Sequence, residues 1–199
     1  MTFAILYLRS RRVPLALAVA LGGAALIWTL WLAFAAKPDI PTYVVAMTIL
    51  LMAAVLSATL SGPDENLDRT ASLRWPWRRA LHLLAGLGVI VVVQIATLHT
   101  GARFGPAALV LRDAAGLMGL TALCTAVVGA DRSWFLPLGW TTISVMYPQE
   151  GTWAAAATWQ GQLPGNRPAA LTATALAVGG LIAYSLAGPA RREAAEYVR

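Results

Sequence analysis

The residues of this chain that could carry out chemistry are few and scattered. Its two histidines, His82 and His99, stand 17 residues apart in one apolar stretch, a separation of about 25 Å along a helix, so they cannot share a metal ion or a haem there. The single cysteine, Cys124, lies in an apolar run and has no intrachain disulfide partner. Lys37, the only lysine, follows two alanines, which excludes a phosphate-binding loop of the Gly-x-x-x-x-Gly-Lys type.

An acidic cluster, Asp64, Glu65 and Asp68, is followed by Arg69. Carboxylates so arranged suit a hard metal ion, and together with His82 they would carry the chemistry of a lipid-modifying enzyme. Such a run is more often the capped, acidic first turn of a helix. We therefore expect no metal, no cofactor, no catalytic residue and no enzymatic activity, and keep the enzyme as the least favoured alternative.

A second group of polar residues interrupts long apolar runs. Ionisable residues inside a membrane are costly and by default indicate function, so this group predicts a polar pathway or a closed gate. In the structural alternative, Arg112 reaches the outer headgroups while Asp113 pairs with a neighbouring helix. The group comprises Gln94, Arg112, Asp113, Thr141, Thr142 and Ser144.

Composition explains what must position these residues. Of the 199 residues, 58% are apolar and only 12% are charged, against about 25% charged in soluble domains. This places the chain among membrane proteins. The net charge of +6 does not indicate nucleic acid, because the basic residues fall in short clusters between apolar runs.

The apolar runs predict an all-α integral membrane protein that forms a single transmembrane domain over residues 1–199. Roughly 20 apolar residues are needed to cross the membrane as a helix. One segment is short, since residues 134–147 reach only about 20 Å as a helix. They would need either a thinned bilayer or help from the segment that follows. We expect a bundle of six spans at residues 13–36, 41–60, 80–98, 107–128, 134–147 and 168–187.

The distribution of positive charge predicts the orientation. Eleven of the fifteen basic residues fall at the ends and connections on one side of the six spans, so that side faces the cytoplasm. Both termini are then cytoplasmic and the chain is multi-pass in the cell membrane. Residues 1–12 form an interfacial lead-in. The following apolar run of residues 13–36 exceeds the about 7–15 residues of the apolar region of a signal peptide, so we expect a retained span.

Two tryptophan pairs are predicted to anchor the chain at the headgroup level. Trp75 and Trp77 belong to the main cytoplasmic loop, residues 62–79. Trp153 and Trp159 lie within the segment 150–162. We interpret this segment as a short outer helix, either interfacial or re-entrant. The alternative for that segment is an ordinary surface loop with interfacial tryptophans.

The basic lead-in, the six spans, the loop 62–79 and the short fifth span with its Trp-flanked outer segment together resemble the membrane-spanning subunits of ABC-2 type transporters. The resemblance implies a permease of an export complex, paired with a copy of itself or with another permease and powered by a separate ATPase. The ATPase would dock on the cytoplasmic loop. Its contacts would be Asp64, Glu65, Asp68, Arg69, Arg74, Arg78 and Arg79.

A different class remains open beside the transporter subunit. It is a non-transport membrane protein, an assembly, anchoring or immunity factor, that acts by binding a partner within the bilayer. The two classes differ in whether a stoichiometric ATPase accompanies the chain.

Overall fold

The computed structural model describes residues 8–62 and 75–190, and in these ranges the chain is helical without a β-strand. Three 3-10 turns punctuate the helices: η1 (Thr97–His99), η2 (Ala130–Arg132) and η3 (Trp159–Gly161). The α-helices are α2 (Val13–Phe34), α3 (Thr42–Ser57), α5 (Trp75–Ala96), α6 (Ala107–Val128), α7 (Phe135–Met146), α8 (Thr152–Ala157) and α9 (Arg167–Ala187).

Four of these helices, α2, α5 with η1, α6 and α9, are long and apolar enough to cross a membrane. The expectation of an all-α protein of the membrane class is thereby confirmed. Two further helices are shorter: α3 has 16 residues and α7 has 12. The third predicted span begins earlier than expected, because α5 starts at Trp75 rather than at Ala80.

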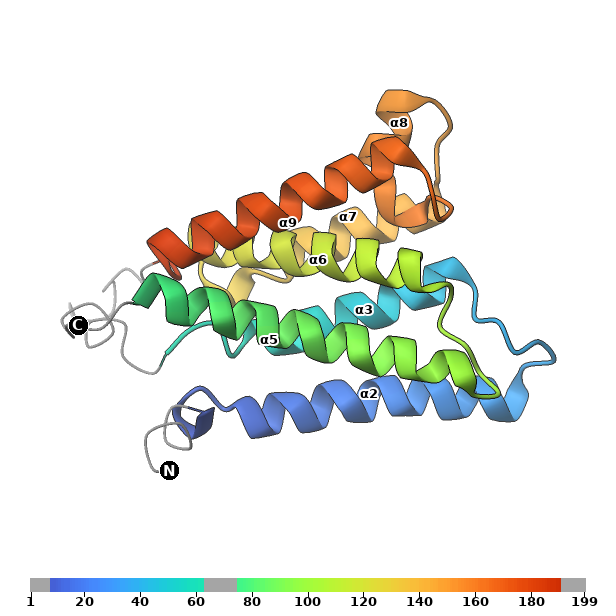
Figure 1. The fold of residues 1–199 in the computed structure, drawn as a ribbon, viewed down its shortest axis with the longest axis horizontal. Coiled ribbons are helices and arrows are strands. Elements are labelled where there is room, and N and C mark those ends of the chain that lie inside the picture. The colour runs from blue at the N-terminus through green and yellow to red at the C-terminus, as the bar shows by residue number, and fades with distance from the viewer. Residues whose placement is uncertain (1–7, 63–74, 191–199) are drawn as a thin grey trace, which may run out of the picture.

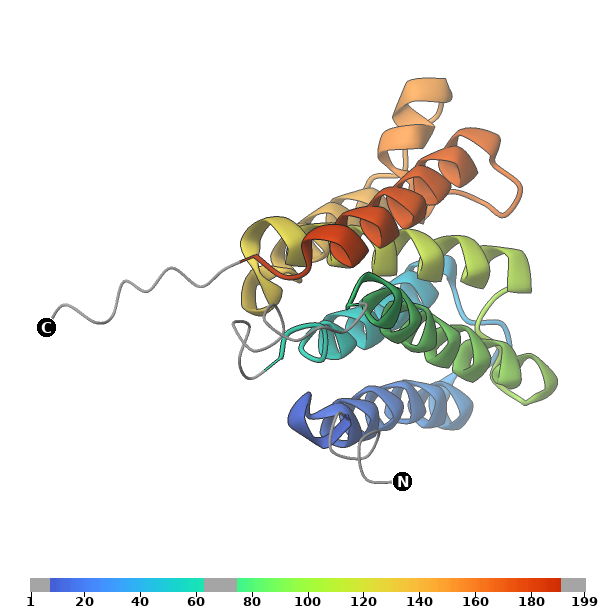
Figure 2. The same ribbon diagram turned by 60° about the vertical axis from the view of Figure 1, so that its left-hand side comes forward.

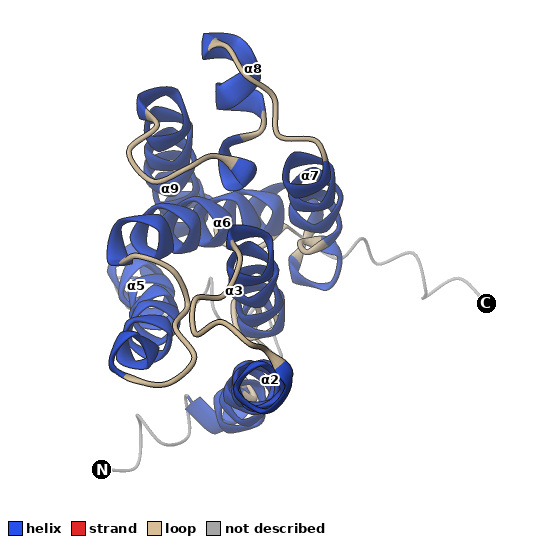
Figure 3. Ribbon diagram, turned by 90° about the vertical axis from the view of Figure 1, so that its right-hand side faces the viewer, coloured by secondary structure: helices blue, strands red, loops and turns tan. Residues whose placement is uncertain are grey.

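The long helices lie side by side and alternate in direction, with the helical lead-in to α2 and the end of α9 at the same end of the bundle (Figure 1). Helix α6 is central and contacts α3, α5, α7 and α9, as the end-on view also shows (Figure 3). Helix α2 lies at one edge, and α8 lies at the opposite edge (Figures 1 and 2).

Glycines bring α6 and α9 into near backbone contact. A Cβ atom added to Gly119 would collide with the backbone of Leu176 and Ala177, and one added to Gly180 would collide with the backbone of Gly119. Association of helices in lipid depends on close packing rather than on the hydrophobic effect. This pair of glycines therefore joins the two helices more closely than side chains would permit.

Helix α2 is attached through small residues and two tryptophans. Its buried residues, Ala16, Ala20 and Ala24, recur at every fourth position and form one face, and α2 packs against α3. At its far end, the indole of Trp28 donates a hydrogen bond of 3.1 Å to the carbonyl of Ala102, and that of Trp31 donates one of 2.9 Å to the carbonyl of Lys37. The C-terminal end of α2 is thus tied to the loops that precede α3 and α6.

At the other end, the chain just past α3 is secured by three side chains. The Arg11 guanidinium and the Tyr184 hydroxyl both donate to the carbonyl of Leu60, at 3.0 and 2.5 Å. The hydroxyl of Thr59 lies 2.9 Å from Nε2 of His82. Carbonyl groups at the C-terminal end of a helix lack intrahelical partners and need others. The contacts near the end of α3 supply such partners and join α2, α3, α5 and α9 in one region.

Substitution of the contact glycine should loosen the bundle. We expect Gly180→Ala to destabilise the protein by about 1–3 kcal/mol, the usual cost of overpacking, because the new methyl group meets the Gly119 backbone. The measurement is thermal unfolding in detergent, followed by tryptophan fluorescence. The neighbouring Gly179→Ala is the matched control, since nothing lies within 4 Å of its added Cβ atom. Equal stability of the two variants would contradict the contact.

Candidate functional site

The candidate site lies near the N-terminal end of α6, where a charged pair is buried in the bundle. Nε of Arg112 lies 2.8 Å from Oδ1 of Asp113, and the two side chains are 7% and 0% exposed. Neighbouring residues of a helix usually point in different directions, so Arg112 turns its guanidinium toward the carboxylate. A buried charge is tolerated only when it is paired, and this pairing is made within one helix.

Arg112 also binds the backbone of the segment that follows α8. Its Nη1 donates to the carbonyl of Leu163 at 3.1 Å, and its Nη2 donates to that of Gln162 at 2.9 Å. The alternative in which Arg112 reaches the headgroups while Asp113 pairs with another helix is therefore wrong. The guanidinium binds the chain itself, and Asp113 pairs with Arg112.

The segment that Arg112 holds turns back into the bundle. Helix α8 projects outside, while η3 contacts α3, α7 and α9. Trp159 and Gln160 are fully buried, and a Cβ atom at Gly116 would lie 2.5 Å from the Trp159 ring. Gln160 donates to the hydroxyl of Thr141 in α7 at 3.3 Å. The second half of the segment 150–162 is thus buried against the helices, unlike an ordinary surface loop.

This burial corrects the role expected for Trp159. A tryptophan at the headgroup level has an accessible edge, whereas the Trp159 side chain is 0% exposed and packs on α6. Trp153, its partner in the sequence pattern, is 88% exposed, and its anchoring role stays a prediction. The spacing of the two residues could not distinguish them, because the chain changes direction between α8 and η3.

Local sequence accounts for the shape of this segment. Gly151 and Gly165 adopt positive φ angles of 99° and 88°, which glycine reaches without steric cost. Gly161 lies against the backbone of Ser144, where a Cβ atom would collide. The Thr158 hydroxyl accepts a hydrogen bond from Gln162 Nε2 at 2.8 Å. This bond within the segment stabilises the turn at η3.

Several polar atoms around η3 are buried without a hydrogen-bond partner in the part of the chain that the structure describes. Native interiors leave few such atoms, and each one asks for an explanation. Thr121 and Gln160 were missed by sequence reasoning, and Trp159 was singled out only as an interfacial anchor, although a glutamine beside a tryptophan in an apolar segment was a usable signal. Two of these atoms belong to η3 itself, Trp159 Nε1 and Gln160 Oε1. The others belong to the helices of the bundle: Asp113 Oδ2 and Thr121 Oγ1 in α6, Ser144 Oγ in α7 and Gln94 Oε1 in α5.

The predicted pathway residues divide into three groups. The side chains of Arg112, Asp113, Thr141 and Ser144 are buried. The segment from Gln160 to Leu163 contacts Arg112, Thr141 and Ser144. Gln94 is buried elsewhere, with its Nε2 3.9 Å from Sδ of Met52. The Thr142 hydroxyl bonds to the carbonyl of Leu138 in its own helix on an exposed face, so Thr142 does not line the interior.

Of the predicted ATPase contacts, Arg78 and Arg79 lie among the described residues, at the opposite end of the bundle. Asp64, Glu65, Asp68, Arg69 and Arg74 fall outside the described residues. Within α5, Arg78 is partly buried and has a partner.

Arg79 requires a correction, since its side chain is not available to a docking protein. The residue is 7% exposed, and its guanidinium lies against Gly188, 2.6 Å from a Cβ atom placed there. A cation near the C-terminal end of α9 interacts favourably with the helix dipole. Helix α5 begins at Trp75, earlier than the sequence predicted, and this directs the Arg79 side chain into the bundle. Trp77 is 73% exposed, whereas the indole nitrogen of Trp75 is buried.

Residues suited to metal binding do not gather in the described ranges, where no group of three or more His, Cys, Asp and Glu side chains occurs. His82 bonds to Thr59, and His99 is exposed near the other end of α5. Cys124 is a free, buried thiol.

Comparison with models of known protein families, with curated proteins and with solved structures found no match.

The buried pair should respond to substitution unlike an exposed one. Arg112→Met leaves the Asp113 carboxylate buried and unpaired, so we expect a loss of about 3–5 kcal/mol in stability. The double variant R112M/D113L should recover part of the loss, because no charge stays behind. Reversible unfolding in detergent provides the measurement.

The chain offers a matched control in the exposed pair of Arg103 and Asp39, which are 3.1 Å apart with side chains 43% and 75% exposed. Arg103→Met should cost less than about 1 kcal/mol. A loss in R112M no larger than that in R103M would show that the pair is not held as described.

Proposed function

We propose that this chain is the membrane-spanning permease subunit of an ABC-type export complex, powered by a separate ATPase that docks on the cytoplasmic loop. The observation that carries the proposal is the outer end of the bundle. There a re-entrant segment with buried polar groups lies over a buried charged pair, inside a protein whose helices are otherwise apolar.

Such an arrangement suits a gate better than a fixed structural plug. Apolar packing alone would close the bundle at lower cost, because buried polar atoms without partners are destabilising. The segment is held to α6 and α7 by hydrogen bonds from Arg112 and Gln160. Hydrogen bonds can be exchanged for others when the segment moves outward, so the polar lining would then serve a passing substrate.

The proposed topology has six spans, with α3 and α7 crossing beside the four longer helices and with both termini cytoplasmic. It is supported by the alternation of helix directions (Figure 1) and by the eleven basic residues that the sequence places on one side. In this topology Arg103 and Trp153 are outside and Arg132 is inside.

Single cysteines test the topology. In a Cys124→Ala background, R103C and W153C should react with a membrane-impermeant maleimide in intact cells, because these residues lie in outer connections. R132C and a cysteine at position 2 should react only after the membrane is opened. Labelling of R132C in intact cells together with W153C would contradict the six-span arrangement.

The energy source is tested by purification from native membranes under mild detergent. We expect an ATPase that has a phosphate-binding loop to copurify at near-stoichiometric amounts, as determined by quantitative mass spectrometry. Arg78→Glu should reduce its recovery several-fold, because charge complementarity steers and holds such contacts. Arg103→Glu, at the opposite end of the bundle, is the control. If no ATPase is recovered with the wild-type chain, the permease proposal fails.

A second function is favoured by a separate observation, the wide apolar face of α2. Leu15, Val19, Leu26 and Leu30 are 49–64% exposed along this edge helix, which could pack against a partner in the bilayer. An assembly, anchoring or immunity factor would use this face. In that case the same purification would recover a membrane protein that lacks a nucleotide site.

A further inference from the structure

A groove opens on the side of the bundle between the end of α6 and the start of α7. Its volume is about 490 Å³, within the about 300–1,000 Å³ typical of small-molecule sites. Apart from one arginine, the residues that line it are apolar or weakly polar. They are Leu123, Cys124, Val127, Val128, Phe135 and Leu136.

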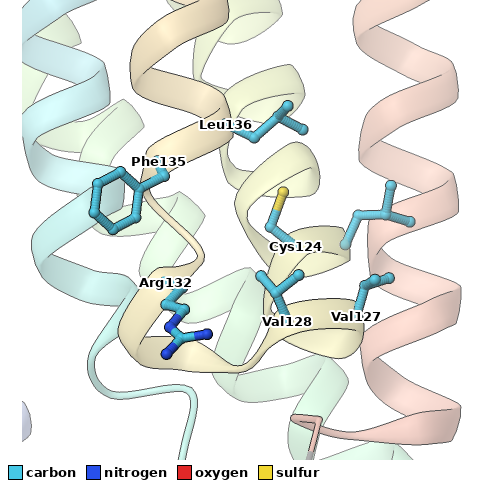
Figure 4. Close-up of a pocket in the computed structure, with 7 residues that line it drawn as sticks. Cys124, Val127, Val128, Arg132, Phe135 and Leu136 are labelled. Carbon is cyan, nitrogen blue, oxygen red and sulfur yellow. The ribbon is translucent and has the colours of Figure 1, made fainter.

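The groove follows from the way in which α7 leaves α6. Gly129 ends α6 with a positive φ of 87°, and η2 turns the chain at once into α7. Helix α7 then packs mainly on α3 and η3 rather than on α6. Figure 4 shows Cys124 between Leu136 and Val128, with Phe135 and Arg132 on the side of the connecting turn.

The walls of the groove are exposed in the protein and suit hydrocarbon. Val127 is 70% exposed, Phe135 59% and Leu136 55%. These residues belong to or adjoin a helix long and apolar enough to cross a membrane, so the groove opens toward lipid. Acyl chains have the right chemistry to cover such a surface.

One cation lies at the end of the groove. Arg132 is exposed and lines the groove beside the turn, and among the described residues it has neither a hydrogen bond nor an ion pair of its own. The adjacent Asp131 already takes part in another interaction. A guanidinium can bind two phosphate oxygens at once, so the charge and the apolar walls complement the two parts of one molecule.

We propose that this groove binds an anionic phospholipid, with an acyl chain along Cys124, Val127 and Leu136 and the phosphate on Arg132. A partner helix fits less well. Two turns of a helix about 10–12 Å wide occupy roughly twice the volume of this groove. The lipid would be bound whichever protein powers or uses the chain, so the proposal goes beyond the function proposed above.

The test is native mass spectrometry of the full chain in detergent with added phosphatidylglycerol or phosphatidylcholine. We expect one phosphatidylglycerol to bind about tenfold more tightly than phosphatidylcholine, because the choline cation offsets the attraction between the lipid phosphate and Arg132. Arg132→Gln should abolish this preference, and Val127→Trp, which fills the groove, should remove the bound lipid. The controls Arg103→Gln and Val92→Trp, the latter at an equally exposed position on α5 (66%), should bind as the wild type does.

Equal binding of the two lipids, or an unchanged preference in R132Q, would overturn the proposal. A photo-reactive residue at position 136 provides a second measurement that does not depend on these variants. In membranes it should form a lipid adduct, and a protein adduct instead would show that a partner helix fills the groove.

Discussion

The half of the bundle in which α6 begins is organised by the need to enclose a charged pair in an apolar surrounding. Asp113 lies in the most buried helix of the bundle, and an unpaired carboxylate there would be very costly. Arg112 supplies the opposite charge, and its remaining donors then need acceptors of their own. The carbonyls of Gln162 and Leu163 provide them, and so the segment beyond α8 is drawn against the bundle.

The two ends of the bundle meet similar requirements in different ways. At the end where α6 begins, one guanidinium binds a carboxylate and two carbonyls from a distant segment. At the other end, Arg11 and Tyr184 converge on the single carbonyl of Leu60, and Arg79 lies against Gly188. Arginines that sequence patterns assign to topology or docking thus also fasten helices to one another. Positive charge at a membrane boundary does not by itself imply a free surface.

The all-α class and most helix positions follow from the sequence, because lipid requires long apolar runs with internally satisfied backbones. The candidate site is less predictable. Arg112, Asp113, Thr141 and Ser144 stood out as polar residues in apolar runs, but Trp159 and Gln160 belong to a segment whose composition fits a surface loop equally well. Their burial depends on Gly116 and Gly161, which let η3 approach α6 and α7. Close approach of this kind is a tertiary property that periodicity does not encode.

The near contact of α6 and α9 has a mechanical consequence. Gly119 and Gly180 leave no layer of side chains between the two backbones, so these helices cannot slide past each other in small rotamer steps. We therefore expect α6 and α9 to behave as one rigid unit within the bundle. A rearrangement is then expected at the interfaces where side chains separate α6 and α9 from α3, α5 and α7. Movement of the segment that follows α8 would leave the α6–α9 contact unchanged.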